Sequence, residues 1–335
     1  MKKLSFAVVV AFAFITILGS PALTEAKPFY EGKILTIIVG YPPGGGYDRM
    51  ARLLSKHLPR FIPGKPVVLV QNMPGASSMI AANYLYSIAK PDGLTIGTFN
   101  RYVTLAQLLK LEGVRFDLQK YAWIGSASVE AAVFTLRADL PYRNVDDMKK
   151  AKEPIFVGNT GEIDTGSQFA PLVKELMGAN IKFVTYPSTG DLILALERKE
   201  VAGYGFTYTT AKQYIDRGLI RPFIRGPISA PGIENLPVNE EMAKTKQVKT
   251  IISILAAPDR LGRPYVAPPK TPEGTMTILR DAFRKLAQDP QAREEAERMK
   301  MELSYTTAPE VTKILQQILN QPADIIAEVG KLGKF

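Results

Sequence analysis

Apolar residues in the first third of the chain fall in short runs that alternate with stretches of helical spacing. Residues 34–40 form a continuous apolar run rich in β-branched side chains, which is typical of a strand buried on both faces. Residues 47–58 carry apolar side chains at helical spacing, residues 66–71 read as a second strand, 78–89 as a second helix and 94–99 as a third strand. This alternation predicts an α/β fold with a mostly parallel sheet flanked by helices.

A second series of the same kind begins after Trp123. The expected strands are 133–137, 155–158, 181–186 and 203–208, and the expected helices are 145–150, 167–177 and 191–197. Beyond Pro272 the pattern is mainly helical, over 275–288, 290–299 and 309–320, and such terminal helices usually pack back on the first domain. We therefore expect domain 1 at 27–128 plus 255–335 and domain 2 at 129–254.

The N-terminus has the plan of a secretory signal peptide. Lys2 and Lys3 precede an uncharged apolar stretch over residues 4–19, and Thr24-Glu25-Ala26 offers small residues at a cleavage site. The stretch is shorter than the roughly 20 residues that a membrane-spanning helix needs. We expect cleavage near Ala26 and export to the periplasm, without a lipid anchor because the chain has no cysteine.

Composition narrows the function classes. The net charge is +10, but the basic residues are scattered and no basic run is interleaved with aromatics, which argues against nucleic-acid binding. Zero cysteines exclude disulfides and thiolate chemistry, and His57 is the only histidine, with no Ser or Asp at triad spacing. The sequence offers no candidate catalytic group that would support an enzymatic function. We also expect no metal site and no cofactor.

The segment Tyr41-Pro42-Pro43-Gly44-Gly45-Gly46-Tyr47-Asp48 lies between the first strand and the first helix. A helix that opens at this edge of a sheet presents unpaired amide N–H groups and the positive end of its dipole, which together favour an anion. Glycines let backbone approach a ligand closely. The segment lacks the Lys and Ser/Thr of a phosphate-binding loop and does not match the dinucleotide-binding pattern.

Two turns of the second domain have a similar composition. Residues 158–161 with 165–167, and residues 186–190, are rich in Gly, Ser and Thr and each leads from a strand to a helix. Ser188 or Thr189 could simply cap its helix. If the two domains face each other, the three turns converge on one cleft, where ligands of open α/β sheets bind.

The opening motif, residues 34–48, closely resembles that of the tripartite tricarboxylate transporter receptors, also called the Bug receptors. Similar stretches recur in order at 72–76, 91–97, 186–190, 236–237, 267–272 and 289–290, so the resemblance covers essentially the whole chain beyond residue 26.

The resemblance implies a two-domain periplasmic-binding-protein (Venus flytrap) fold with two crossing strands, closing on a ligand carboxylate. It also implies, as partner, a membrane permease of one large and one small subunit. We expect the chain to be a monomer. Phe29 or Tyr30, together with Tyr41, could wall the pocket. The ligand-binding positions carried over are Tyr41, Pro43, Gly44, Gly45, Gly46, Tyr47, Asp48, Thr160, Gly161, Thr165, Ser167, Ser188 and Thr189.

Other binding partners and other functions stay open at this point. The closed form could be presented to a sensor kinase or another membrane protein, the chain could serve another class of transporter, or it could be an enzyme. Arg101, after the third strand, is the nearest charged candidate for the ligand, and we expect it instead in a surface ion pair.

Overall fold

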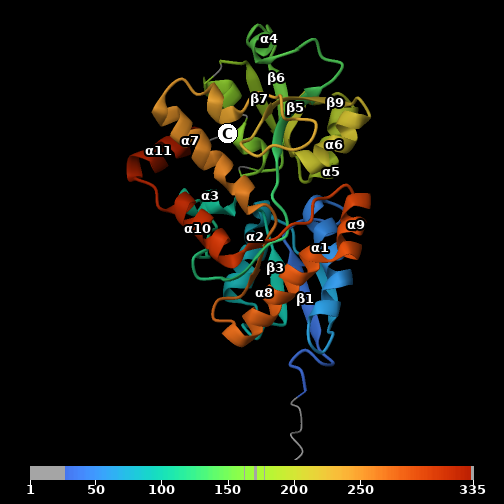
Figure 1. The fold of residues 1–335 in the computed structure, drawn as a ribbon. Helices are drawn as coiled ribbons and strands as arrows, with labels where there is room; N and C mark the ends of the chain where they lie inside the picture. Colours follow the sequence, from blue (N-terminus) through green and yellow to red (C-terminus); the bar gives the residue numbers. More distant parts are fainter. Residues whose placement is uncertain (1–26, 162, 170–171, 177, 333–335) are drawn as a thin grey trace, which may run out of the picture.

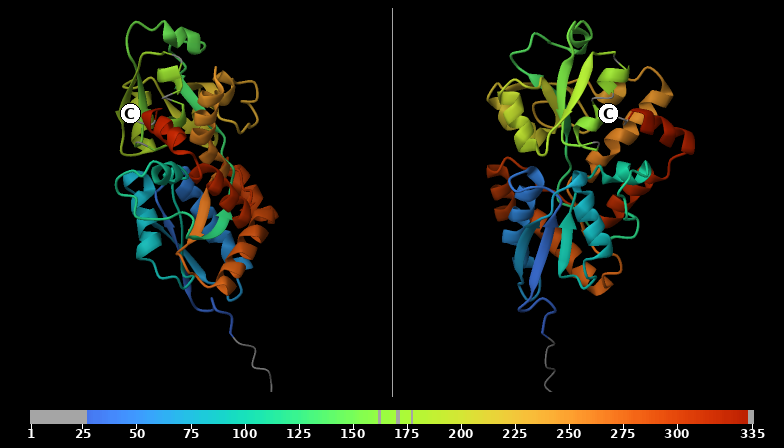
Figure 2. Two further views of the ribbon diagram at one scale, coloured as in Figure 1. Left: turned by 90° about the vertical axis from the view of Figure 1, so that its left-hand side faces the viewer. Right: turned by 180° about the vertical axis from the view of Figure 1, so that it is seen from behind.

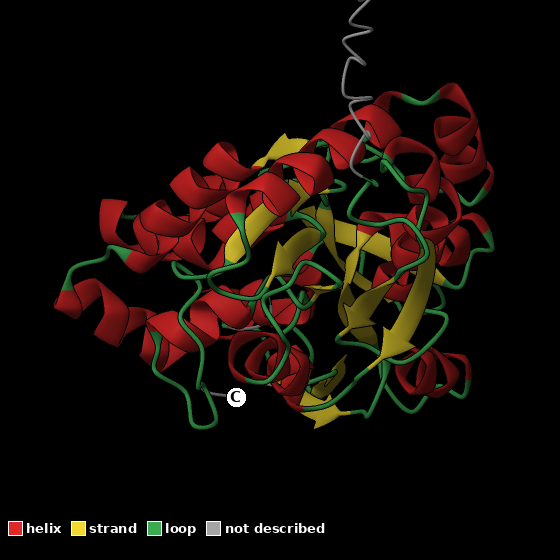
Figure 3. Ribbon diagram, turned by 90° about the horizontal axis from the view of Figure 1, so that it is seen from below, coloured by secondary structure: helices red, strands yellow, loops and turns green. Residues whose placement is uncertain are grey.

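The computed structural model describes residues 27–332 except for 162, 170–171 and 177, so the expected signal peptide lies outside the described part. Two lobes are stacked along the long axis of the molecule (Figure 1), and each is built on its own sheet. Seen from below, helices surround the strands (Figure 3). The predicted two-domain α/β fold is therefore confirmed.

The first lobe, lowest in Figure 1, has a six-stranded sheet in the order β11-β4-β10-β3-β1-β2. β1 pairs in parallel with β2 and β3, whereas β10 lies antiparallel between β3 and β4. The strands are β1 (Ile34–Val39), β2 (Val67–Asn72), β3 (Thr95–Thr98), β4 (Ala122–Ser126), β10 (Pro264–Ala267) and β11 (Thr306–Thr307). The helices are α1 (Gly46–His57), α2 (Met79–Ser87), α3 (Val103–Leu108), α8 (Glu273–Gln288), α9 (Pro290–Arg298), α10 (Ala308–Leu319) and α11 (Ala323–Leu332).

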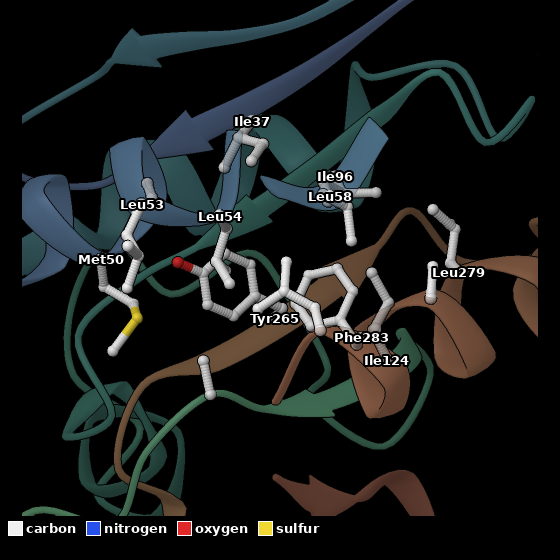
Figure 4. Close-up of a cluster of buried hydrophobic side chains, with 14 of the residues drawn as sticks. Ile37, Met50, Leu53, Leu54, Leu58, Ile96, Ile124, Tyr265, Leu279 and Phe283 are labelled. Atoms are coloured by element: carbon white, nitrogen blue, oxygen red, sulfur yellow. The ribbon is translucent and has the colours of Figure 1, made fainter. Parts of the chain in front are cut away.

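Strand alternation divides the core of this lobe between the two faces of the sheet. Leu35, Ile37 and Val39 of β1 pack with α1, α8 and α9, and Ile38 packs on the opposite face with α2, α3 and α10. Figure 4 shows the first of these clusters, where the rings of Tyr265 and Phe283 lie 5.2 Å apart. Both faces are covered, which explains the continuous apolar run of β1.

The second lobe has a five-stranded sheet in the order β7-β6-β8-β5-β9, with β5 antiparallel to both of its neighbours. The strands are β5 (Ala132–Arg137), β6 (Ile155–Asn159), β7 (Ile181–Thr185), β8 (Gly203–Thr207) and β9 (Ile220–Arg225). The helices are α4 (Val145–Lys149), α5 (Thr189–Glu197), α6 (Tyr208–Asp216) and α7 (Lys246–Ala256). α7 packs against α11, so the C-terminal helix reaches the junction of the lobes (Figures 1 and 2).

Two segments join the lobes side by side. One runs from β4 to β5 and the other enters β10, and backbone hydrogen bonds link them, from Ala127 N to Arg263 O (3.0 Å) and from Arg263 N to Ser128 O (3.3 Å). Gly262 has φ +56°, and a Cβ there would lie 1.6 Å from Ser128 O. Only glycine fits so close to the other segment.

Some elements differ from the sequence-based expectation. The helix expected over 167–177 is, within the described residues, a 3₁₀ turn (Gly166–Gln168) and a π-helical turn (Leu172–Leu176). β9 was not predicted because Pro222 interrupts its pattern, and the structure accommodates this proline at an edge strand beside a register shift in β5.

Within residues 27–332, apart from the gaps named above, no helix has the length and hydropathy needed to cross a membrane.

Candidate ligand-binding cleft

A cleft of about 1000 Å³ lies between the lobes. The three predicted turns all line it, through residues 40–46 of the first lobe and 160–161 and 185–190 of the second. Residues 74–79 of the first lobe also line it, as do Leu111, Ile163 and Ile193, whose side chains make part of its wall apolar.

A smaller inner chamber of about 70 Å³ adjoins the cleft and shares Tyr41, Gly45, Gly46 and other lining residues with it. Most of its remaining wall is polar or charged. Its other lining residues are Thr160, Thr189 and Thr210, which it also shares with the cleft, and Tyr47, Asn100, Arg101, Asp164, Thr165, Tyr204, Phe206, Thr207 and Arg263.

The glycine turn delivers the N-terminus of α1 to both spaces. Gly45 is the N-cap, with φ −74° and ψ 172°, and no side chain caps it. Since the first amides of a helix have no intrahelical acceptor, the N–H groups of Gly45, Gly46 and Tyr47 are the donors that the turn offers here. The positive end of the α1 dipole adds to this attraction for an anion.

Asp48 holds the turn in place rather than lining either space. Its side chain is 1% exposed and accepts hydrogen bonds from Gly44 N (2.8 Å), Arg52 Nε (2.9 Å) and Asn72 Nδ2 (2.9 Å). Burial alone would raise the pKa of Asp48, but these bonds outweigh it and lower the pKa below its ordinary value. The Gly44 amide is thus engaged within the protein, which removes one of the donors that the sequence suggested.

Two tyrosines at the ends of the same turn brace it and also line the inner chamber. Tyr41 and Tyr47 stack with ring centroids 4.7 Å apart. The Tyr47 hydroxyl accepts a hydrogen bond from Arg101 N (3.1 Å) and donates to Gly262 O (3.4 Å), so it ties the turn to the joining segment. Burial, followed by the nearby Tyr47, raises the pKa of Tyr41 well above its ordinary value, and its hydroxyl stays protonated at neutral pH.

In the second lobe, the turn after β6 is organised around Asp164. Its carboxylate accepts hydrogen bonds from Thr160 N (2.6 Å), Thr160 Oγ1 (3.0 Å) and Tyr204 Oη (3.2 Å). Burial, and then the charge of Asp164, raises the pKa of Tyr204 well above its ordinary value. Gly161 N donates to Asn159 Oδ1 (3.2 Å), so both predicted amides of this turn have acceptors within the protein.

The other predicted residues of the second lobe divide into two groups. Thr165 and Thr189 line the inner chamber. Ser188 lines the outer cleft but caps α5, accepting from Asp191 N (3.2 Å) and donating to Asp191 Oδ2 (2.6 Å). Ser167 lies in the 3₁₀ turn after the β6 loop.

The family model described as "Tripartite tricarboxylate transporter family receptor" matches residues 50–331. The chain belongs to this family. It is a family of receptors rather than of enzymes, and the match lies beyond the glycine turn, so it is independent of the opening motif.

Solved structures show the same fold. The periplasmic binding protein BugD superposes with a TM-score of 0.73 at 20% identity, over 91% of this chain and 99% of that one. MatC from Rhodopseudomonas palustris with bound malate gives 0.69 at 16% identity, over 90% and 99%. A further R. palustris protein, with adipate, gives 0.71 at 17% identity, over 90% and 97%.

The surface ion pair expected for Arg101 of the receptor is wrong. Arg101 is 2% exposed, and its Nε and Nη2 donate to Asp259 Oδ1 at 3.1 and 2.8 Å. Gln168 of the second lobe donates to Asp259 Oδ2 (2.9 Å) and to the hydroxyl of Tyr102 (2.6 Å). Arg101 therefore belongs to a buried network that joins the lobes at the wall of the inner chamber. Sequence alone could not show that its partner lies so far along the chain.

Phe29 and Tyr30 were also misplaced as possible walls of the pocket. Tyr30 is fully buried, and its hydroxyl donates to Gly93 O (2.9 Å). Phe29 is 40% exposed and lies under the ammonium group of Lys33. Neither residue lines the cleft or the inner chamber.

A second first-lobe element of the receptor at the cleft is a strained turn that sequence reasoning did not assign. Ala76, Ser77 and Ser78 have φ values of 46°, 51° and 77°, a conformation that costs each non-glycine residue about 1–2 kcal/mol. Ser78 Oγ donates to Gly40 O (2.8 Å), which holds this turn on the end of β1. The only sequence signal was the short Asn-Met-Pro-Gly-Ala stretch in the family resemblance.

Proposed function

We propose that this receptor captures a small organic carboxylate between its lobes in the periplasm and delivers it to a membrane permease of one large and one small subunit. The observation that carries the proposal is the uncapped N-terminus of α1, which opens into the cleft between two lobes. Malate and adipate in two proteins of the same fold support a carboxylate ligand. The receptor acts as a monomer and catalyses no reaction.

In this proposal the lobes correspond to residues 27–128 plus 255–335 and to residues 129–254. The ligand bridges them and so binds the closed form better, which shifts the population toward closure. Amides of Gly45, Gly46 and Tyr47 grip the carboxylate, and hydroxyls of Thr165 and Thr189 face it from the second lobe. The apolar side of the outer cleft accommodates the remainder of the ligand.

A thermal-shift screen of the mature receptor tests the proposal. The panel contains malate, adipate, glutamate, benzoate and nicotinate, with glucose, calcium chloride and benzamide as controls. An acid present at one hundred times its dissociation constant stabilises the folded state by about 2.7 kcal/mol, and we expect at least one acid to do so. If only the sugar, the cation or the neutral amide raised the melting temperature, the carboxylate assignment would be wrong.

A further inference from the structure

Arg263 stands at the entry to β10, where the second joining segment meets the first lobe, and only 2% of it is exposed. Its Nη2 lies 3.0 Å from Glu130 Oε1 and 3.4 Å from Thr209 Oγ1. Its Nη1 is buried and has no hydrogen-bond partner among the described residues. A guanidinium nitrogen always carries its protons, and a buried unpaired donor is costly, so this nitrogen is available to an acceptor that the protein does not supply.

The guanidinium group lies against the glycine turn. Arg263 lines the inner chamber together with Gly45 and Gly46. A Cβ at Gly46 would lie only 2.7 Å from Arg263 Nη2, and the ring of Tyr47 is 5.9 Å from the guanidinium carbon. Because residue 46 is a glycine, the Arg263 guanidinium can lie against the first turn of α1.

The charges around the chamber distinguish Arg263 from the other cation there. Arg101 is engaged by Asp259 through both Nε and Nη2. Glu130 accepts hydrogen bonds from Ser128 Oγ and Thr209 Oγ1, and its ion pair with Arg263 is made through Nη2. Arg263 is thus the buried cation beside the α1 amides that retains an unpaired nitrogen.

We propose that Arg263 is the charged partner of the ligand's carboxylate, with Nη1 donating to one carboxylate oxygen in the inner chamber while amides of α1 bind the other. This inference rests on the proposed function. The chamber holds about 70 Å³ and the outer cleft about 1000 Å³, so the chamber suits a head group and the cleft suits the rest of the ligand. The ligand class is accordingly an acid that inserts its head group here and leaves its tail in the outer cleft.

Two near-isosteric variants should change the affinity for acids in opposite directions. Glu130→Gln keeps a hydrogen-bond acceptor for Nη2 but removes the charge that neutralises Arg263, so acids should bind about threefold to tenfold more tightly. The double variant Arg263→Gln with Glu130→Gln removes both charges together and avoids an unpaired buried carboxylate. Acids should bind it about tenfold or more weakly than they bind the unmodified receptor, since a hydrogen bond to a charged group is lost.

Isothermal titration calorimetry with the acids of the panel above, and with benzamide as the neutral probe, measures these changes. Arg263→Lys, which keeps the charge for Glu130 but loses the fork of nitrogens, is a further variant in case the double variant does not fold. It should weaken acid binding, and melting temperatures without ligand report the folding of each variant.

The outcomes separate this inference from the proposed function. Tighter binding to Glu130→Gln, with weaker binding to the double variant or to Arg263→Lys, supports the assignment. Unchanged affinities in folded variants would overturn it while the carboxylate receptor stands. If no acid binds the unmodified receptor, the proposed function itself fails.

Discussion

Gly45 offers a direct test of main-chain anion binding, because its conformation suits two substitutions of which only one removes the amide N–H. Its φ of −74° is close to the proline value of about −65°, and a Cβ at this position meets no atom within 4 Å. Gly45→Pro removes the amide N–H from the N-cap of α1, whereas Gly45→Ala adds a side-chain carbon and keeps the donor.

The expected effect follows from the loss of one hydrogen bond to a charged group, about 1.5–3 kcal/mol, or about a 10-fold to 150-fold rise in Kd. Calorimetric titration of both variants with the tightest acid of the panel measures it, and melting curves without ligand check the fold. Gly45→Ala should bind within a few-fold of the unmodified receptor. Equal affinities for the proline and alanine variants would show that the Gly45 amide does not contact the ligand.

Three further predictions concern stability. Gly262→Ala places a Cβ 1.6 Å from Ser128 O on a residue with φ +56°, and we expect urea titration to show a free energy of unfolding lower by on the order of 3 kcal/mol. Asp259→Ala leaves the Arg101 guanidinium buried without its anion and should cost about 3–5 kcal/mol in the same assay, whereas an exposed pair would cost at most about 1 kcal/mol. Hydrogen bonds from a lysine and the only histidine lower the pKa of Glu295, so its stabilisation is present above the unfolded pKa of about 4.3 and is lost as the pH falls through the lower folded value. Glu295→Gln should therefore reduce the difference in melting temperature between pH 7 and pH 3.

Matched controls sharpen these experiments. Gly274→Ala lies in α8, where an added Cβ meets nothing within 4 Å, so it should leave stability unchanged or raise it by up to about 1 kcal/mol. If it lowered stability as much as Gly262→Ala, the close approach at Ser128 would not be the cause. Glu294→Gln is the control for Glu295, since the Glu294 side chain is 68% exposed, and an equal flattening of the pH dependence would contradict the assigned ion pair.

The sequence predicted best the elements whose local signals agree. β1 is buried on both faces and ends in prolines and glycines that cannot continue a strand, so its continuous apolar run and the following turn were readable. The first helix was expected over 47–58 and begins one residue earlier, at Gly46, because a glycine N-cap gives no side-chain signal.

Elements defined by distant partners were not predicted. β10 has only four residues and begins with Pro264, and its strand conformation depends on pairing with β3 and β4. The same applies to the site. Composition pointed to the glycine turn, but Arg263 and Tyr204 reach the inner chamber only because two lobes meet, and neither carries a motif of its own.

The engagement of individual amides also required the structure. Sequence placed Gly44 and Thr160 in turns rich in potential donors, yet Asp48 and Asp164 accept those particular N–H groups. An aspartate four residues after its partner is compatible with many local geometries, so spacing alone could not separate an organising carboxylate from one that contacts a ligand.

The two joining segments are hydrogen-bonded to each other, and this limits how the receptor can move. Two independent linkers would let one lobe rotate freely over the other. Two hydrogen-bonded segments bend together as one unit. If the receptor closes on its ligand as proposed, the bonded pair favours one direction of bending, so that different ligands would bring the same two outer surfaces to the same relative orientation. The proposed membrane permease could then recognise one closed shape whatever the chemistry of the enclosed molecule.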